Sequence, residues 1–94
     1  MDKLKDLKLK EIGEYIKNIR EQKNISIYSI EKNYHIDRGN WSRIENGKHG
    51  SFLKPETLKQ IAQILDINYI ELYKIAGYID DEAISEYINK KDSE

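Results

Sequence analysis

Apolar residues recur along this chain at intervals of three and four positions, the spacing that places side chains on one face of an α-helix. The first stripe predicts a helix from about residue 8 to residue 23, which Asn24 ends, and the stripe consists of Leu9, Ile12, Ile16 and Ile19. Two interpretations stay open for residues 1–10, where leucines alternate with lysines: a solvated lead-in to this helix, and a basic arm that contacts phosphates.

Two short helices are expected next. Ser26 is a good N-cap, and the apolar positions Ile27, Ile30 and Tyr34 predict a helix over residues 27–34. A tight turn at residues 35–36 then leads into the second short helix. Two helices joined by a turn of about three residues form a helix-turn-helix, whose second helix can lie in the major groove of DNA.

The second short helix lies between a start signal, Asp37, and a stop signal, Gly47. Trp41 and Ile44 are three positions apart and therefore share a face. A helix of this length needs support from its neighbours, so that face is expected to point into the core. For Trp41 the two interpretations are a wedge against DNA and a core side chain, and its spacing with Ile44 favours the core.

Three further helices complete the pattern. One begins at Pro55 and runs to about residue 66, and the next covers residues 69–76, with Asn68 as its cap and Gly77 as its end. A terminal helix starts in acidic residues, closes in lysines and carries the apolar residues Ile84, Tyr87 and Ile88. The sequence therefore predicts an all-α fold of five helices in residues 1–78, plus a short acidic sixth helix in residues 79–94.

Composition narrows the class of protein. The chain of 94 residues has no cysteine, which fits a reducing cytoplasm and excludes thiolate metal sites. His35 and His49 lie far apart and make no metal-ligand spacing, so no metal or cofactor is expected. Apolar runs are too short to span a membrane. We also find no glycine-rich phosphate loop, nucleophile motif or convergent carboxylate pair, and therefore no indication of an enzyme.

The net charge of −1 conceals an uneven distribution. Residues 1–54 carry 12 lysines and arginines against 8 acidic residues, whereas residues 55–94 carry 4 against 9. The basic excess therefore belongs to the half that contains the predicted helix-turn-helix. Such an asymmetry favours a nucleic-acid partner for that half.

Residues 12–78 resemble the Cro/C1-type (XRE-like) helix-turn-helix regulators. The similarity rests on an ordered set of stretches: Ile12-Gly13, Ile25-Ser26, Ser42-Arg43-Ile44-Glu45-Asn46-Gly47, Pro55-Glu56-Thr57-Leu58, Glu71-Leu72 and Ala76-Gly77-Tyr78. The resemblance implies a lambda-repressor-like, five-helix DNA-binding fold. The chain departs from the family where a small residue is usual and Glu31 stands, where glycine is usual and His35 stands, and at Ile27. Glu31 beside the bulky Trp41 implies an altered angle between the two short helices.

The family pattern also implies a set of DNA contacts. Arginine can bind guanine through two parallel hydrogen bonds, and asparagine can bind adenine in the same way. The residues expected to face the bases are Arg38, Gly39, Asn40, Ser42 and Arg43. Those expected at the phosphates are Ser26, Asn46, Lys48 and His49. The alternative is that Arg38, Arg43 and Lys48 form an ordinary solvated face. The resemblance further implies a structural ion pair between Arg20 and Glu45.

These features predict that the protein is a sequence-specific transcriptional regulator that binds double-stranded DNA. We expect it to be a repressor that binds a pseudo-palindromic operator as a homodimer. The apolar stripe of the terminal helix is the candidate dimer surface, and its packing against its own domain is the alternative. An antitoxin-like protein that neutralises a partner through residues 79–94 is the second functional hypothesis, because the same fold serves in that class.

Overall fold

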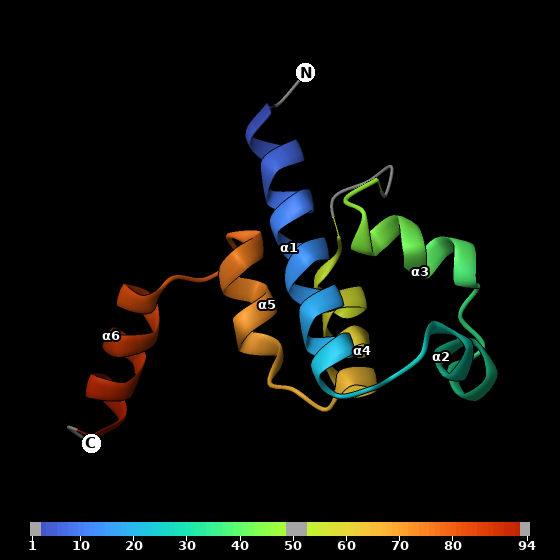
Figure 1. Ribbon diagram of the computed structural model, residues 1–94. Coiled ribbons are helices and arrows are strands. Elements are labelled where there is room, and N and C mark those ends of the chain that lie inside the picture. The colour runs from blue at the N-terminus through green and yellow to red at the C-terminus, as the bar shows by residue number, and fades with distance from the viewer. Residues whose placement is uncertain (1–2, 49–52, 93–94) are drawn as a thin grey trace.

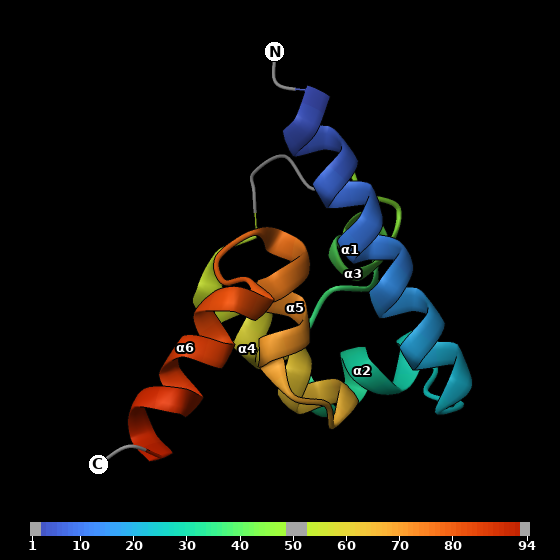
Figure 2. The same ribbon diagram turned by 90° about the vertical axis from the view of Figure 1, so that its left-hand side faces the viewer.

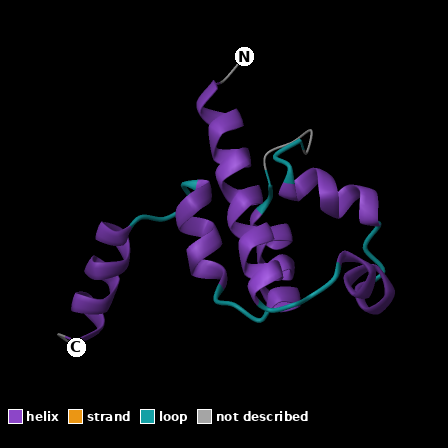
Figure 3. Ribbon diagram, viewed as in Figure 1, coloured by secondary structure: helices purple, strands orange, loops and turns teal. Residues whose placement is uncertain are grey.

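The computed structural model describes residues 3–48 and 53–92, and over these ranges it is built of helices without strands (Figures 1 and 3). The helices are α1 (Lys3–Gln22), α2 (Ile27–Tyr34), α3 (Arg38–Glu45), α4 (Pro55–Leu65), α5 (Tyr69–Ala76) and α6 (Asp81–Asp92). The predicted all-α class is confirmed. The bounds of α2 and α5 are those expected from the sequence, α3 lies between the expected start signal Asp37 and stop signal Gly47, and α4 ends one residue earlier. His49 lies outside the described residues.

The start of α1 corrects one expectation. The helix begins at Lys3, so the interpretation of residues 1–10 as a lead-in before a helix at residue 8 is wrong. Leucine and lysine both have high helix propensity, and no glycine or proline interrupts residues 3–10, so the helix continues toward the N-terminus. At its other end, Asn24 takes the left-handed conformation with φ of 57° and ends the helix as predicted.

Local side-chain chemistry fixes where the short helices begin. The Ser26 hydroxyl accepts a hydrogen bond from the backbone N–H of Ser29 at 3.0 Å. The Asp37 carboxylate does the same for Asn40 at 3.0 Å. These caps satisfy backbone donors that have no partner within the helix. Side-chain caps therefore place the starts of both helices of the helix-turn-helix.

The core lies between α1, α3, α4 and α5, and α2 adds one buried side chain to it. Figure 1 shows α1 running between α5 on one side and α3 on the other, and both neighbours pack against it. The fully buried large side chains are Ile12, Ile16, Ile30, Trp41, Leu58, Leu65 and Leu72. Trp41 is 0% exposed, so its interpretation as a core side chain is confirmed. Tyr34 was expected on the apolar side of α2 but is 48% exposed, so the buried part of that side is limited to Ile30.

Helix α6 stands apart from the bundle, beyond α5 (Figures 1 and 2). An ion pair ties the two helices together, with Lys74 Nζ 2.8 Å from Asp81 Oδ1. This hydrogen bond raises the pKa of Lys74. Tyr87 and Ile88 of α6 are 64% and 50% exposed, so most of its apolar stripe is not covered by the chain's own core. Over residues 3–48 and 53–92, no helix has the length and apolar character needed to cross a membrane.

Candidate nucleic-acid interface

Helices α2 and α3 are joined by a turn of three residues. His35 takes the left-handed conformation with φ of 58°, and its backbone N–H donates to the Glu31 carbonyl at 2.9 Å, which closes α2. Glycine takes this conformation without strain, whereas a histidine pays the conformational cost that a side chain has in this region. The chain reverses after His35, and α3 lies along the edge of the molecule (Figure 1).

The polar side of α3 points outward, away from Trp41. The predicted base-contacting residues that are exposed are Arg38, Gly39, Asn40 and Arg43, and Ser42 is half-buried. Among the predicted phosphate-contacting residues, Ser26, Asn46 and Lys48 are exposed. The structure therefore displays the described members of both sets on the surface, whereas Trp41, Ile44 and Glu45 of the same helix are buried.

Two of the outward side chains contact each other. The Arg43 guanidinium donates a hydrogen bond from Nη2 to the Asn40 side-chain oxygen. The residues are three positions apart on α3, a spacing that brings side chains together on a helix. This hydrogen bond does not use the Asn40 NH₂ group or the other N–H groups of the Arg43 guanidinium. Because both residues are exposed, these donors are available side by side on the surface of α3.

Arg38 is held by a carboxylate from the preceding helix. Glu31 Oε1 lies 3.0 Å from Arg38 Nε, and Glu31 Oε2 accepts the Arg38 backbone N–H at 3.2 Å. Glu31 sits on the last turn of α2 and Arg38 is the first residue of α3, so one carboxylate bridges the turn. The sequence identified Glu31 as a departure from the family but missed this pairing. The pairing could have been predicted from two features of the sequence: Glu31 and Arg38 carry opposite charges, and they lie seven residues apart on either side of the tight turn.

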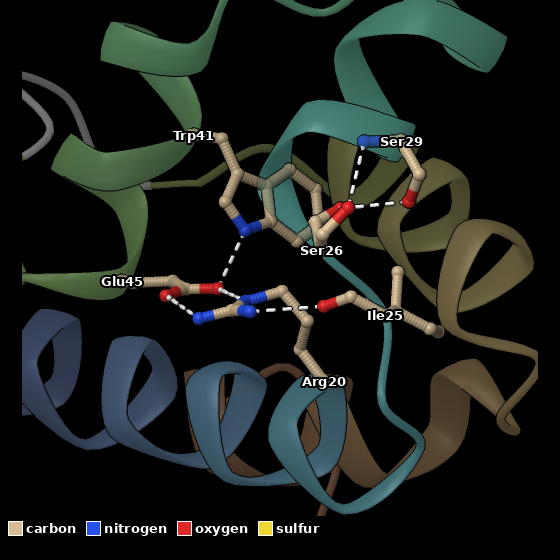
Figure 4. Close-up of polar contacts among 6 residues, drawn as sticks. All are labelled: Arg20, Ile25, Ser26, Ser29, Trp41 and Glu45. Carbon is tan, nitrogen blue, oxygen red and sulfur yellow. Dashed lines mark hydrogen bonds and ion pairs between the residues drawn. The ribbon is translucent and has the colours of Figure 1, made fainter.

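A polar cluster beneath α3 fixes its position on α1 (Figure 4). Arg20 of α1 binds both carboxylate oxygens of Glu45, with Nε 2.6 Å from Oε2 and Nη2 3.1 Å from Oε1. Arg20 Nη1 also donates to the Ile25 carbonyl at 2.9 Å. The hydrogen bond to Glu45 is the main cause that raises the pKa of Arg20. Side chains of this pair are only 13% and 5% exposed, so it is an internal contact of the fold.

Close approach of the backbones adds a second constraint between α1 and α3. A Cβ atom built on Gly13 of α1 would lie 2.5 Å from the Glu45 carbonyl oxygen and would also collide with the Ile44 carbonyl. A Cβ atom built on Gly47, which has φ of +68°, would lie 2.8 Å from the Cα atom of Lys10. The C-terminal end of α3 therefore rests directly on the backbone of α1. Gly13 and Gly47 were both named from the sequence, but the close packing of α3 on α1 at these residues was not predicted.

Metal chemistry has no support in this region. Among the described residues, no group of three or more histidine, cysteine or acidic side chains is placed to hold a metal ion. The groups that α3 offers are hydrogen-bond donors and acceptors of the kind that bind base edges and phosphates.

Comparison with known proteins agrees with this geometry. A family model described as a helix-turn-helix domain matches residues 13–78. Over 84 residues the chain is 34% identical to the HTH-type transcriptional repressor RghR of Bacillus subtilis (strain 168), covering 87% of this chain and 62% of that protein. Over 67 residues it is 31% identical to the uncharacterized HTH-type transcriptional regulator RghRB of the same strain, covering 71% and 48%. No solved structure matches significantly.

The matches span less than two thirds of the length of either relative. The family match includes the helix-turn-helix itself together with the second part of α1 and the whole of α4 and α5. The resemblance inferred from the sequence is therefore confirmed, and this chain belongs to the helix-turn-helix domain family as an XRE-like member.

Proposed function

We propose that this protein is a sequence-specific, double-stranded DNA-binding transcriptional regulator that acts as a repressor by occupying its operator. The observation that carries the proposal is the outward display of Arg38, Asn40 and Arg43 by a helix whose other side, through Trp41, is buried. Family membership supports the same function, and the word repressor is taken from the printed name of RghR.

Base contacts are assigned to the exposed side of α3, where Arg38 at the start of the helix reads a base or binds phosphate. Asn40 and Arg43 are the proposed base-reading residues, because amide and guanidinium groups bind base edges in pairs of hydrogen bonds. Ser42 is half-buried between them. Gly39 has no side chain and would let the backbone come close to the bases. Asn46, Lys48 and the N-terminus of α2 at Ser26 would contact phosphates and hold the register.

Selection of bound sites from random duplex DNA, at a stated salt concentration, tests this function. We expect recovery of one short motif with two-fold symmetry, because dimeric proteins of this kind bind two half-sites. The matched control is the chain with Asn40→Ala and Arg43→Ala, which keeps the Trp41 side of α3 intact. Recovery of no motif by the unaltered chain, or of the same motif by the control, would contradict the proposal.

Dimerisation is proposed to use α6. Its exposed Tyr87 and Ile88 lie near the middle of a helix that begins with Asp81 and Glu82 and has Lys90 and Lys91, followed by Asp92, in its last turn. Antiparallel pairing of two such helices about a two-fold axis places the acidic start of each beside the basic end of the other.

Sedimentation of the full chain tests the dimer. Ile88→Asp should convert dimer into monomer, and Asn89→Asp adds the same charge to the same helix at an exposed position outside the stripe. A dimer that survives Ile88→Asp rules out this surface.

An antitoxin-like role is the second candidate, and the same exposed stripe on α6 favours it. In that case the stripe would cover another protein. Purification of the chain from its native cells should then return a partner in one-to-one ratio, and Ile88→Asp should release it. A chain recovered with no partner, and dimeric alone, argues for the regulator acting by itself.

A further inference from the structure

We propose that Glu31 is a specificity-determining positioning residue, which holds Arg38 at the start of α3 and restricts how that arginine can contact DNA. The inference rests on the proposed DNA-binding function and adds a residue to it. Glu31 was not among the residues expected to face DNA, and the small residue usual at this position in the family cannot form the contact.

The geometry ties down both ends of Arg38. One carboxylate oxygen of Glu31 accepts the backbone N–H of Arg38 at 3.2 Å, and the other lies 3.0 Å from Nε of the same residue. Holding the backbone and the guanidinium through a single carboxylate limits the rotamers open to the side chain. The Arg38 side chain is nevertheless 61% exposed, so its terminal amino groups still reach the solvent where DNA would lie.

The same contact partly neutralises the positive charge of Arg38 at the N-terminal end of α3. Glu31 pairs with Arg38 at this end of the helix, whereas Arg43 and Lys48 lie toward the opposite end. An arginine matched by a carboxylate attracts phosphate less than a free one does, and phosphate attraction carries the sequence-independent part of DNA binding. Glu31 therefore lowers binding to any duplex while leaving directional hydrogen bonds available to the correct one.

The experiment compares Glu31→Gln with the unaltered full chain on two duplexes, the selected site and one of unrelated sequence, across a series of salt concentrations. We expect Glu31→Gln to bind the unrelated duplex more tightly, with a slope of log affinity against log salt steeper by about 0.9, as one added phosphate contact gives. Preference for the selected site should fall about fivefold or more, the loss expected when one base contact is misplaced.

Two controls separate this effect from charge or folding. Glu71→Gln makes the same charge change on α5, across α1 from α3, and should leave the preference unchanged (Figure 1). In an Arg38→Ala background, Glu31→Gln should alter the preference by less than about twofold, because Glu31 acts through Arg38. An effect that persists in that background would overturn the positioning role.

A measurement without DNA tests the contact itself. The chain has three arginines, so their Nε–H groups can be followed by NMR. The Arg38 signal should show slowed hydrogen exchange that Glu31→Gln removes, while the Arg20 signal, held by Glu45, stays unchanged. An unaltered chain that binds no duplex would overturn the proposed function and this inference together. Normal binding with salt slope and preference unchanged in Glu31→Gln would overturn this inference alone.

Discussion

The indole Nε1 of Trp41 donates a hydrogen bond to Glu45 Oε2 at 2.5 Å, one helical turn further along α3. The same carboxylate oxygen also binds Nε of Arg20 on α1 at 2.6 Å. The buried indole donor and the guanidinium therefore share one acceptor, and this shared acceptor joins α3 to α1. A buried carboxylate with both oxygens bonded stabilises one orientation of α3 on α1.

We expect Glu45→Ala to lower the free energy of unfolding by about 3–5 kcal/mol, because it leaves the Arg20 charge and the Trp41 indole donor buried without their partner. Chemical denaturation followed by circular dichroism measures the change. The matched control is Glu71→Ala, whose exposed carboxylate lies 3.8 Å from Lys74. This exposed pair should contribute less than about 1 kcal/mol. A loss of similar size in both variants would mean that the Arg20–Glu45 pair behaves as a surface contact.

Gly13→Ala should destabilise the fold by about 1–3 kcal/mol, as overpacking of a filled site does. The new methyl group would lie against the Ile44 and Glu45 carbonyls, which are backbone atoms and cannot rotate away. Helix α3 must therefore move off α1, and DNA binding should weaken as well. Thermal melting and a gel-shift titration check the two effects. A variant with unchanged stability would show that the two helices separate without cost.

Gly39→Ala makes the opposite test, since its Cβ would meet only the Asp37 carboxylate, at 2.9 Å, which is the end of a side chain. Alanine is favoured over glycine within a helix by about 0.5–1 kcal/mol, so stability should stay within about 1 kcal/mol of the unaltered chain. DNA affinity should fall, because the methyl group stands on the face proposed to approach the bases. Unchanged affinity would show that the backbone at Gly39 stays away from DNA.

Arg43→Ala and Lys48→Ala should change DNA binding in two different ways. Loss of the Arg43 fork should cost about 1–3 kcal/mol of binding and relax the preference at one base position. Loss of Lys48 should weaken binding to every sequence alike and reduce the salt slope by about one. Quantitative binding to a set of single-base variants of the selected site distinguishes these outcomes. Equal losses on all sequences for both variants would contradict base reading by Arg43.

The sequence predicted best those features that depend on neighbours along the chain. Ser26, Asp37 and Asn68 cap the helices that follow them within three residues, so the starts of α2, α3 and α5 were predictable from local chemistry. The inward orientation of Trp41 followed from its spacing with Ile44. By contrast, the apolar stripe placed the start of this first helix at about residue 8, and the turns of α1 before that point were missed.

Features that depend on tertiary approach were harder to predict. The role of Gly13 requires knowing that α1 and α3 meet at that point, 31 positions apart in the sequence at Ile44. The contact between Glu31 and Arg38 depends on the angle that the turn gives to α2 and α3. The exposure of Tyr34 depends on where the core ends beneath α2. The spacing of apolar residues within a single helix carries no information about any of these three features.

Trp41 has a practical consequence because it is the single tryptophan of the chain. Its emission comes from one place, the junction of α3 with α1, and an indole in apolar surroundings emits at shorter wavelength than one in water. Native fluorescence, with no attached dye, therefore reports whether that junction stays closed when a duplex is added.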